Sequence, residues 1–97
     1  MPTYGKFHLQ GGRAGFIRFR EGDVEGSLEW EMLAGEIDMA LYPGGCWWLV
    51  PSETQMQPNE VRRLGQELAT EMQISIDLAF TNGSEVVRPR LRGAKSK

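Results

Sequence analysis

The chain has 97 residues, of which 40% are hydrophobic and 25% are charged, and its formal net charge at pH 7 is -2. This length allows one domain with one core, and the composition is that of a folded globular protein. The single Cys and single His exclude a disulfide within the chain and leave a zinc site built from these residue types close to impossible. No cofactor and no metal site is expected.

The N-terminal sequence lacks the apolar stretch of a secretory signal peptide. The longest uninterrupted apolar run spans only Cys46 to Val50, whereas a membrane-spanning helix needs about 20 apolar residues. We therefore expect a cytoplasmic protein that does not bind membranes. Cys46 itself is interpreted as a buried, unreactive thiol.

The first half of the chain consists of segments of strand length separated by turn signals. Apolar and polar residues alternate over residues 24–32 and again over 36–41, which is typical of half-buried strands. The turn signals are Gly11-Gly12, Gly22-Asp23, Ala34-Gly35 and Pro43-Gly44-Gly45.

Short loops at these signals place the apolar residues of every strand on one face of a single sheet. The predicted partners are Phe7 with Ile17, Ile17 with Leu28, Gly15 with Trp30, Met32 with Ile37 and Leu41 with Cys46. A slip of one residue would turn a whole strand over, so this agreement predicts a five-stranded antiparallel meander.

The spacing of apolar residues becomes helical after Pro51. It predicts a helix over about 58–72 that packs on the apolar face of the sheet, with Asn59 as its candidate cap. Gly65 is expected to mark a close contact with the sheet. The apolar stripe of this helix is Val61, Leu64, Leu68 and Met72.

Alternation returns over residues 74–80 and predicts a sixth, C-terminal strand, whose position in the sheet stays open. From residue 81 onward the composition predicts a flexible basic tail. The sequence therefore predicts one α+β domain over residues 1–80 and a tail over residues 81–97.

Charge is segregated along the chain. Residues 1–20 carry no acid, residues 21–61 carry no Lys or Arg, and the last ten residues carry only basic charges. The predicted registers set Glu31 opposite Asp38 on the sheet face away from the helix. Like charges in this arrangement destabilise a strand pair, so we interpret the pair as retained for binding. The candidate partner-binding residues are Glu25, Glu29, Glu31, Glu36, Asp38 and Trp47.

The same face carries Lys6, Arg18 and Arg20 at its other end, so it is predicted to be bipolar. An enzyme is not expected and no catalytic residue is assigned, because a flat sheet offers no cleft that would shift the pKa of a carboxylate. Two alternatives stay open. One is a nucleic-acid-associated or regulatory domain that acts through the basic tail, and the other is a subunit that pairs through an edge strand.

Several short segments share one layout: Glu31-Met32-Leu33-Ala34-Gly35, Trp47-Trp48, Pro51 and Asn59 to Leu64. This layout resembles that of small immunity proteins that accompany bacterial polymorphic toxins, including those of contact-dependent growth inhibition systems. The resemblance covers about residues 13–80. It implies a protein that neutralises a cognate toxin C-terminal domain, often a nuclease, and we expect a monomer before binding and no nucleic-acid ligand.

Overall fold

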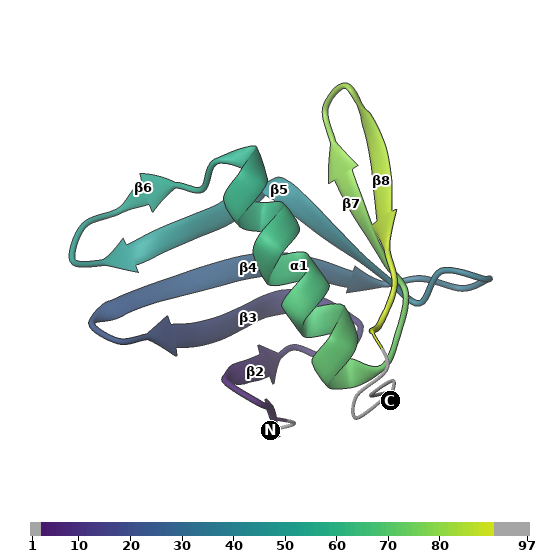
Figure 1. The fold of residues 1–97 in the computed structure, drawn as a ribbon, viewed down its shortest axis with the longest axis horizontal. Coiled ribbons are helices and arrows are strands. Elements are labelled where there is room, and N and C mark those ends of the chain that lie inside the picture. Colours follow the sequence, from purple (N-terminus) through teal and green to yellow (C-terminus); the bar gives the residue numbers. More distant parts are fainter. Residues whose placement is uncertain (1–2, 91–97) are drawn as a thin grey trace, which may run out of the picture.

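The computed structural model describes residues 3–90, which form one eight-stranded sheet with a helix, α1 (Pro58–Met72), lying across it (Figure 1). The strands follow the order β1-β2-β3-β4-β5-β7-β8, and β6 pairs with β5. The predicted α+β architecture is confirmed. The strands are β1 (Thr3–Tyr4), β2 (Phe7–Gln10), β3 (Ala14–Glu21), β4 (Val24–Met32), β5 (Met39–Val50), β6 (Thr54–Gln55), β7 (Ile76–Phe80) and β8 (Gly83–Val87).

The hairpin between β3 and β4 has the predicted register. Ile17 lies opposite Leu28, and Gly15 lies opposite Trp30. The turn begins at Gly22, whose φ of 59° is the left-handed conformation that glycine adopts without strain. A two-residue turn with Gly in its first position therefore fixed this register.

The two neighbouring hairpins are each displaced by two residues from the predicted register. Ile17 pairs with Leu9 and not with Phe7, and Met32 pairs with Met39 and not with Ile37. A displacement of two keeps every side chain on its face, so alternation alone cannot detect it. Ile37 instead lies in the loop before β5, where the Leu33 N–H donates to the Asp38 carbonyl over 3.0 Å.

The predicted hairpin at residues 42–45 is wrong, because β5 continues through this segment as one strand beside β4. Residues 27–29 of β4 lie opposite residues 42–47 of β5, so Pro43-Gly44-Gly45 forms a β-bulge. Pro and Gly are typical both of turns and of bulges. The sheet still contains five successive antiparallel strands, β1 to β5, because the short strand β1 pairs with β2.

Helix α1 has the predicted bounds and buries its predicted stripe, with Met72 partly buried. A Cβ on Gly65 would lie 2.8 Å from Leu78 Cδ2, which confirms the close contact with the sheet. The cap is Gln57 and not Asn59. Glu60 reaches back to the start of the helix, where its Oε1 accepts from the Gln57 N–H over 2.8 Å.

The sixth predicted strand is β7, which runs parallel to the first part of β5, with Met39 opposite Ile76. The segment after it does not begin a tail at residue 81, because residues 83–87 form β8 and pair antiparallel with β7. Its two adjacent valines, Val86 and Val87, favour a strand. Residues 91–97 of the predicted tail lie outside the described residues.

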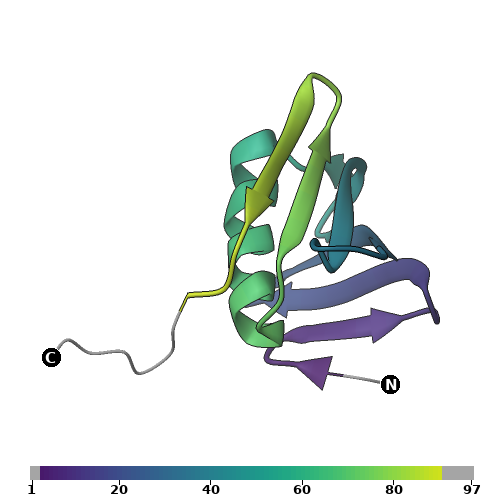
Figure 2. The ribbon, with the colours of Figure 1, turned by 90° about the vertical axis from the view of Figure 1, so that its right-hand side faces the viewer.

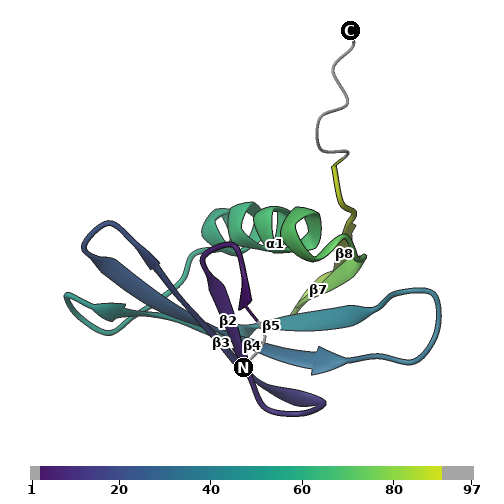
Figure 3. The ribbon, with the colours of Figure 1, turned by 90° about the horizontal axis from the view of Figure 1, so that it is seen from below.

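The core lies between α1 and one face of the sheet (Figures 2 and 3). Phe7 and Phe19 pack with their ring centroids 5.7 Å apart. Cys46 is fully buried in the same core cluster, and its burial agrees with the prediction. No helix within residues 3–90 is long and apolar enough to cross a membrane.

Candidate protein-binding face

The sheet face turned away from α1, called here the outer face, is covered by no other element of the described chain (Figure 3). Its side chains alternate with those of the core. In β5, Ala40, which its neighbours leave only 3% exposed, and Tyr42 alternate with the core residues Met39 and Leu41. In β7, Asp77 lies between two core residues. Binding groups on this face are thus carried by strands that the core holds in place.

The middle of the outer face contains a hollow of about 290 Å³, called here the aromatic hollow. Two large side chains project around it, with Phe16 48% exposed and Trp47 39% exposed. Ser27, which is only 8% exposed, is the most deeply buried of its lining residues. The lining residues are Gln10, Phe16, Arg18, Ser27, Gly45, Trp47 and Leu49.

The bulge in β5 shapes one side of this hollow. Gly45 lines the hollow, and a Cβ on it would lie 2.0 Å from Glu29 Oε1. Any larger residue would therefore collide with the Glu29 side chain. Glycine at this position lets the carboxylate of Glu29 lie against the backbone at the edge of the aromatic hollow.

An acidic patch, defined as Glu29, Glu31, Tyr42 and Asp77, adjoins the hollow. The Tyr42 hydroxyl donates a hydrogen bond to Glu31 Oε1. This bond, and after it burial and the surrounding carboxylates, raises the pKa of Tyr42. Glu31 and Asp77 lie on either side of Ala40 in the strand order, and both adjoin Tyr42.

Asp77 contributes an unfavourable feature to this patch. Its Oδ1 atom is buried and has no hydrogen-bond partner among residues 3–90. Aspartate is also unfavourable in a strand. Such a group costs stability, and a costly residue at an open face is a feature that binding sites often contain.

Basic side chains occupy the other end of the outer face. His8 lies opposite Arg18, and Arg20 forms a cross-strand ion pair with Glu25. Arg18 makes no ion pair within the described part of the chain and lines the aromatic hollow. The outer face is therefore bipolar through Arg18 and Arg20, with the hollow between its two ends. The predicted place of Lys6 on this face is wrong, because Lys6 lies in the turn between β1 and β2 and pairs with Glu21 and with Glu67 of α1.

The predicted binding residues are only partly brought together. Glu25, Glu29, Glu31 and Trp47 lie on the strands of the outer face. The predicted pairing of Glu31 with Asp38 is wrong, because the two-residue displacement sets Glu31 opposite Ala40. Asp38 Oδ2 instead accepts from the Ser75 N–H over 3.0 Å, which ties β5 to the segment before β7. Glu36 is exposed in the loop before β5.

Two members of the acidic patch were missed by sequence reasoning. Tyr42 was assigned to a turn, and the strand that carries Asp77 could not be placed beside β5. The alternation of Asp77 with Ile76 and Leu78 was the available signal for its outward position. Phe16 lies opposite Glu29 and was not counted among the predicted binding residues.

Other acids of the segment 21–61 serve the folded structure on the helix side. Glu21 forms ion pairs with Arg63 at 2.8 Å and with Lys6 at 2.5 Å. The hydrogen bond from Arg63, followed by that from Lys6, lowers the pKa of Glu21 to about 2. Glu60 Oε1 accepts from the Trp48 indole over 3.1 Å. The acidic segment therefore does not form one continuous surface.

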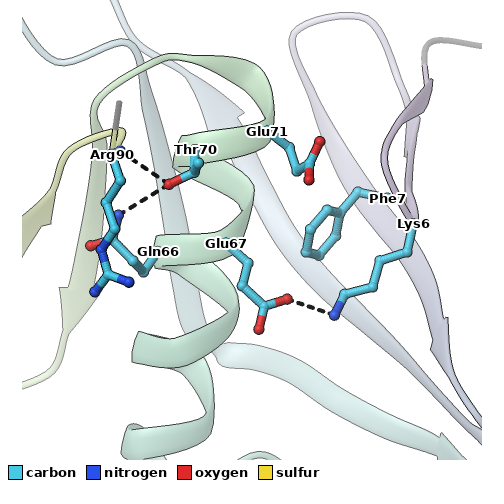
Figure 4. Close-up of a pocket in the computed structure, with 7 residues that line it drawn as sticks. All are labelled: Lys6, Phe7, Gln66, Glu67, Thr70, Glu71 and Arg90. Carbon is cyan, nitrogen blue, oxygen red and sulfur yellow. Dashed lines mark hydrogen bonds and ion pairs between the residues drawn. The ribbon is translucent and has the colours of Figure 1, made fainter. Parts of the chain in front are cut away.

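A second hollow, of about 410 Å³, lies beside the C-terminal half of α1 (Figure 4). Its polar groups largely bind one another. Lys6 Nζ lies 2.6 Å from Glu67 Oε1, and Thr70 Oγ1 accepts from the Arg90 backbone N–H over 3.1 Å. These contacts already use the groups that would orient a ligand, so we do not assign the binding site here. The lining residues are Lys6, Phe7, Gln66, Glu67, Thr70, Glu71 and Arg90.

Comparison with known proteins finds no family model, no curated protein and no solved structure that matches this chain. Within residues 3–90, no group of three or more His, Cys, Asp or Glu side chains could hold a metal ion. The arrangement on the outer face therefore has to be interpreted from its own chemistry. Exposed rings beside carboxylates, on an uncovered sheet face, are suited to binding a protein surface.

Proposed function

We propose that this chain is an immunity-type protein that binds and neutralises a cognate bacterial toxin domain through its outer face. One observation carries the proposal: an uncovered sheet face combines the aromatic hollow with the adjoining acidic patch. Aromatic side chains in a central pocket commonly supply most of the binding energy of an interface, and charges around them select the partner.

The charge of the patch favours a toxin domain with a basic surface, such as a nuclease. Enzymes that cleave nucleic acids bind polyanions, so their substrate-binding surfaces are cationic. Glu29 and Glu31 present carboxylates beside exposed rings. Complementary charge also accelerates association, which is an advantage when a toxin must be captured before it acts. On this proposal the chain acts by binding and not by catalysis.

The experiment that tests this proposal measures binding to the toxin domain encoded beside the gene for this chain. We expect stoichiometric inhibition of the toxin and an affinity that falls as salt concentration rises. The variant Glu29→Lys/Glu31→Lys should bind much more weakly and should lose most of this salt dependence. Calorimetry at two salt concentrations gives both quantities.

A matched control changes the net charge equally at another place. Asp23 lies in the turn between β3 and β4, and Glu53 lies between β5 and β6; both are exposed and outside the acidic patch. The variant Asp23→Lys/Glu53→Lys should retain most of the affinity. Equal losses in the two double variants would show that only net charge matters, and the outer face would then not be the binding surface.

A further inference from the structure

The aromatic hollow has the dimensions of a site for a single side chain. Its volume of about 290 Å³ lies at the lower limit of pockets that enclose small-molecule ligands, which are typically about 300–1,000 Å³. It is also open to solvent on the outer face and is formed by side chains of β2, β3, β4 and β5. A side chain that projects from a protein surface can fill such a hollow, whereas a free metabolite bound there would remain largely exposed to water.

The residues around the hollow differ in charge from one end to the other. Arg18 lines it on the side of β3 and makes no ion pair within residues 3–90. Glu29 lies against Gly45 on the side of β5. An apolar group that enters between them therefore has a free cation on one side and a carboxylate on the other.

We infer that the aromatic hollow receives one large apolar side chain of the protein partner, flanked in that partner by a carboxylate that meets Arg18 and a cation that meets Glu29. This inference rests on the proposed function and specifies the partner surface. Phe16 and Trp47 surround the inserted side chain, and the small side chain of Ser27 leaves the space that it fills. The order of charges fixes the direction in which the partner lies on the sheet.

The first experiment needs no partner. The full chain, labelled with ¹⁵N, is titrated with N-acetyltryptophanamide as a probe for an apolar side chain. We expect saturable shifts at the Trp47 indole N–H and at the amides of Phe16 and Ser27. The indoles of Trp30 and Trp48 serve as internal controls and should shift little. Shifts centred on Trp48, or no saturable shift, would overturn the inference.

A charged probe examines the role of Arg18. N-acetyltryptophan has a free carboxylate in place of the amide, so it should bind more tightly than N-acetyltryptophanamide. In the variant Arg18→Gln, the two probes should bind with nearly equal affinity. An advantage that persists in Arg18→Gln would contradict the proposed contact between Arg18 and a carboxylate.

The second experiment uses the toxin domain. Phe16→Ala and Trp47→Ala should each weaken binding about tenfold or more, as truncation of a central anchor does. The matched controls Val50→Ala and Val86→Ala, at residues that are 39% and 43% exposed, should change it less than about threefold. Thermal melts establish that each variant is folded.

The outcomes separate this inference from the proposed function. If reversal of Glu29 and Glu31 abolishes toxin binding while Phe16→Ala and Trp47→Ala do not weaken it, the hollow is not the anchor site but the outer face remains the interface. If the amide probe fills the hollow and the toxin does not bind, the proposed function fails. A dimer that Trp47→Ala dissociates would identify a second copy as the occupant and would overturn the inference.

Discussion

The Glu29 side chain occupies the space on the outer face that a side chain at Gly45 would need. A Cβ on Gly45 would lie 2.0 Å from Glu29 Oε1 and 2.8 Å from Glu29 Cβ. The bulge of β5 and the carboxylate beside the aromatic hollow are therefore one structural unit. A substitution at either residue should therefore alter the effect of a substitution at the other on the free energy of unfolding. This coupling can be measured without the partner.

Gly45→Ala should lower the free energy of unfolding by about 1–3 kcal/mol, because the added methyl group displaces the Glu29 side chain from its place against the backbone. Urea denaturation measures this change. Gly44→Ala is the matched control, since nothing lies within 4 Å of a Cβ on Gly44. Glu29→Ala combined with Gly45→Ala should restore part of the loss. If the effects of the two substitutions on the free energy of unfolding were strictly additive, the proposed contact between residue 45 and the Glu29 side chain would be contradicted.

Asp77→Thr should raise the free energy of unfolding by about 1 kcal/mol, because it removes a buried carboxylate oxygen that lacks a hydrogen-bond partner among residues 3–90 and introduces a residue that favours strands. The same variant should weaken binding of the toxin domain, since the acidic patch loses a charge. Ala79→Thr, two residues further along the same strand, is the control for strand preference. A decrease in stability on Asp77→Thr would show that Asp77 supports the fold.

The stability of the protein should fall in acid through Glu21. The folded-state pKa of this carboxyl is lowered to about 2, chiefly by the hydrogen bond from Arg63, and its ordinary value is 4.5. Its contribution is therefore fully present above about pH 4.5 and is lost as the pH falls toward 2. Glu21→Gln should be less stable at pH 7 by about 1–2 kcal/mol and should show a flatter pH dependence in this window. Unfolding curves between pH 2 and 7 provide the comparison, and an unchanged slope would exclude Glu21 as the cause.

Cys46 should react slowly with thiol reagents in the folded protein. Its side chain is fully buried, so a reagent cannot reach it. Burial also raises the pKa of the thiol to about 11, so only a small fraction is the reactive thiolate at pH 8. Denaturation in urea should accelerate the reaction with Ellman's reagent by orders of magnitude. Similar rates before and after denaturation would show that the segment around the bulge opens readily.

The sequence allowed the fold class, the helix and the β3–β4 hairpin to be predicted because each depended on a local and sharply defined signal. Gly22 set the turn, and the spacing of Val61, Leu64 and Leu68 set the helix face. The neighbouring hairpins were displaced by two residues because alternation reports only which face a residue occupies. The turn signals in the sequence did not show that the loops of these two hairpins are longer than the shortest possible ones.

The candidate site was less predictable because it depends on relationships between distant segments. Tyr42 joins Glu31 only because the bulge keeps β5 continuous, and Asp77 reaches the patch only through the parallel pairing of β7 with β5. Neither relationship has a local signature. Glu29, Glu31 and Trp47 were found because strand alternation alone brings them to the outer face.

The parallel pairing of β7 with β5 has a consequence for how the chain is made. Met39 and Ile76 lie on either side of α1 in the sequence, so they can pair only after the whole helix has been synthesised. During synthesis the N-terminal strands leave the ribosome first, and their apolar face has no cover until the helix follows. We therefore expect the nascent chain to be most prone to aggregation before residue 72 emerges, and truncation at that stage to produce a species that chaperones retain.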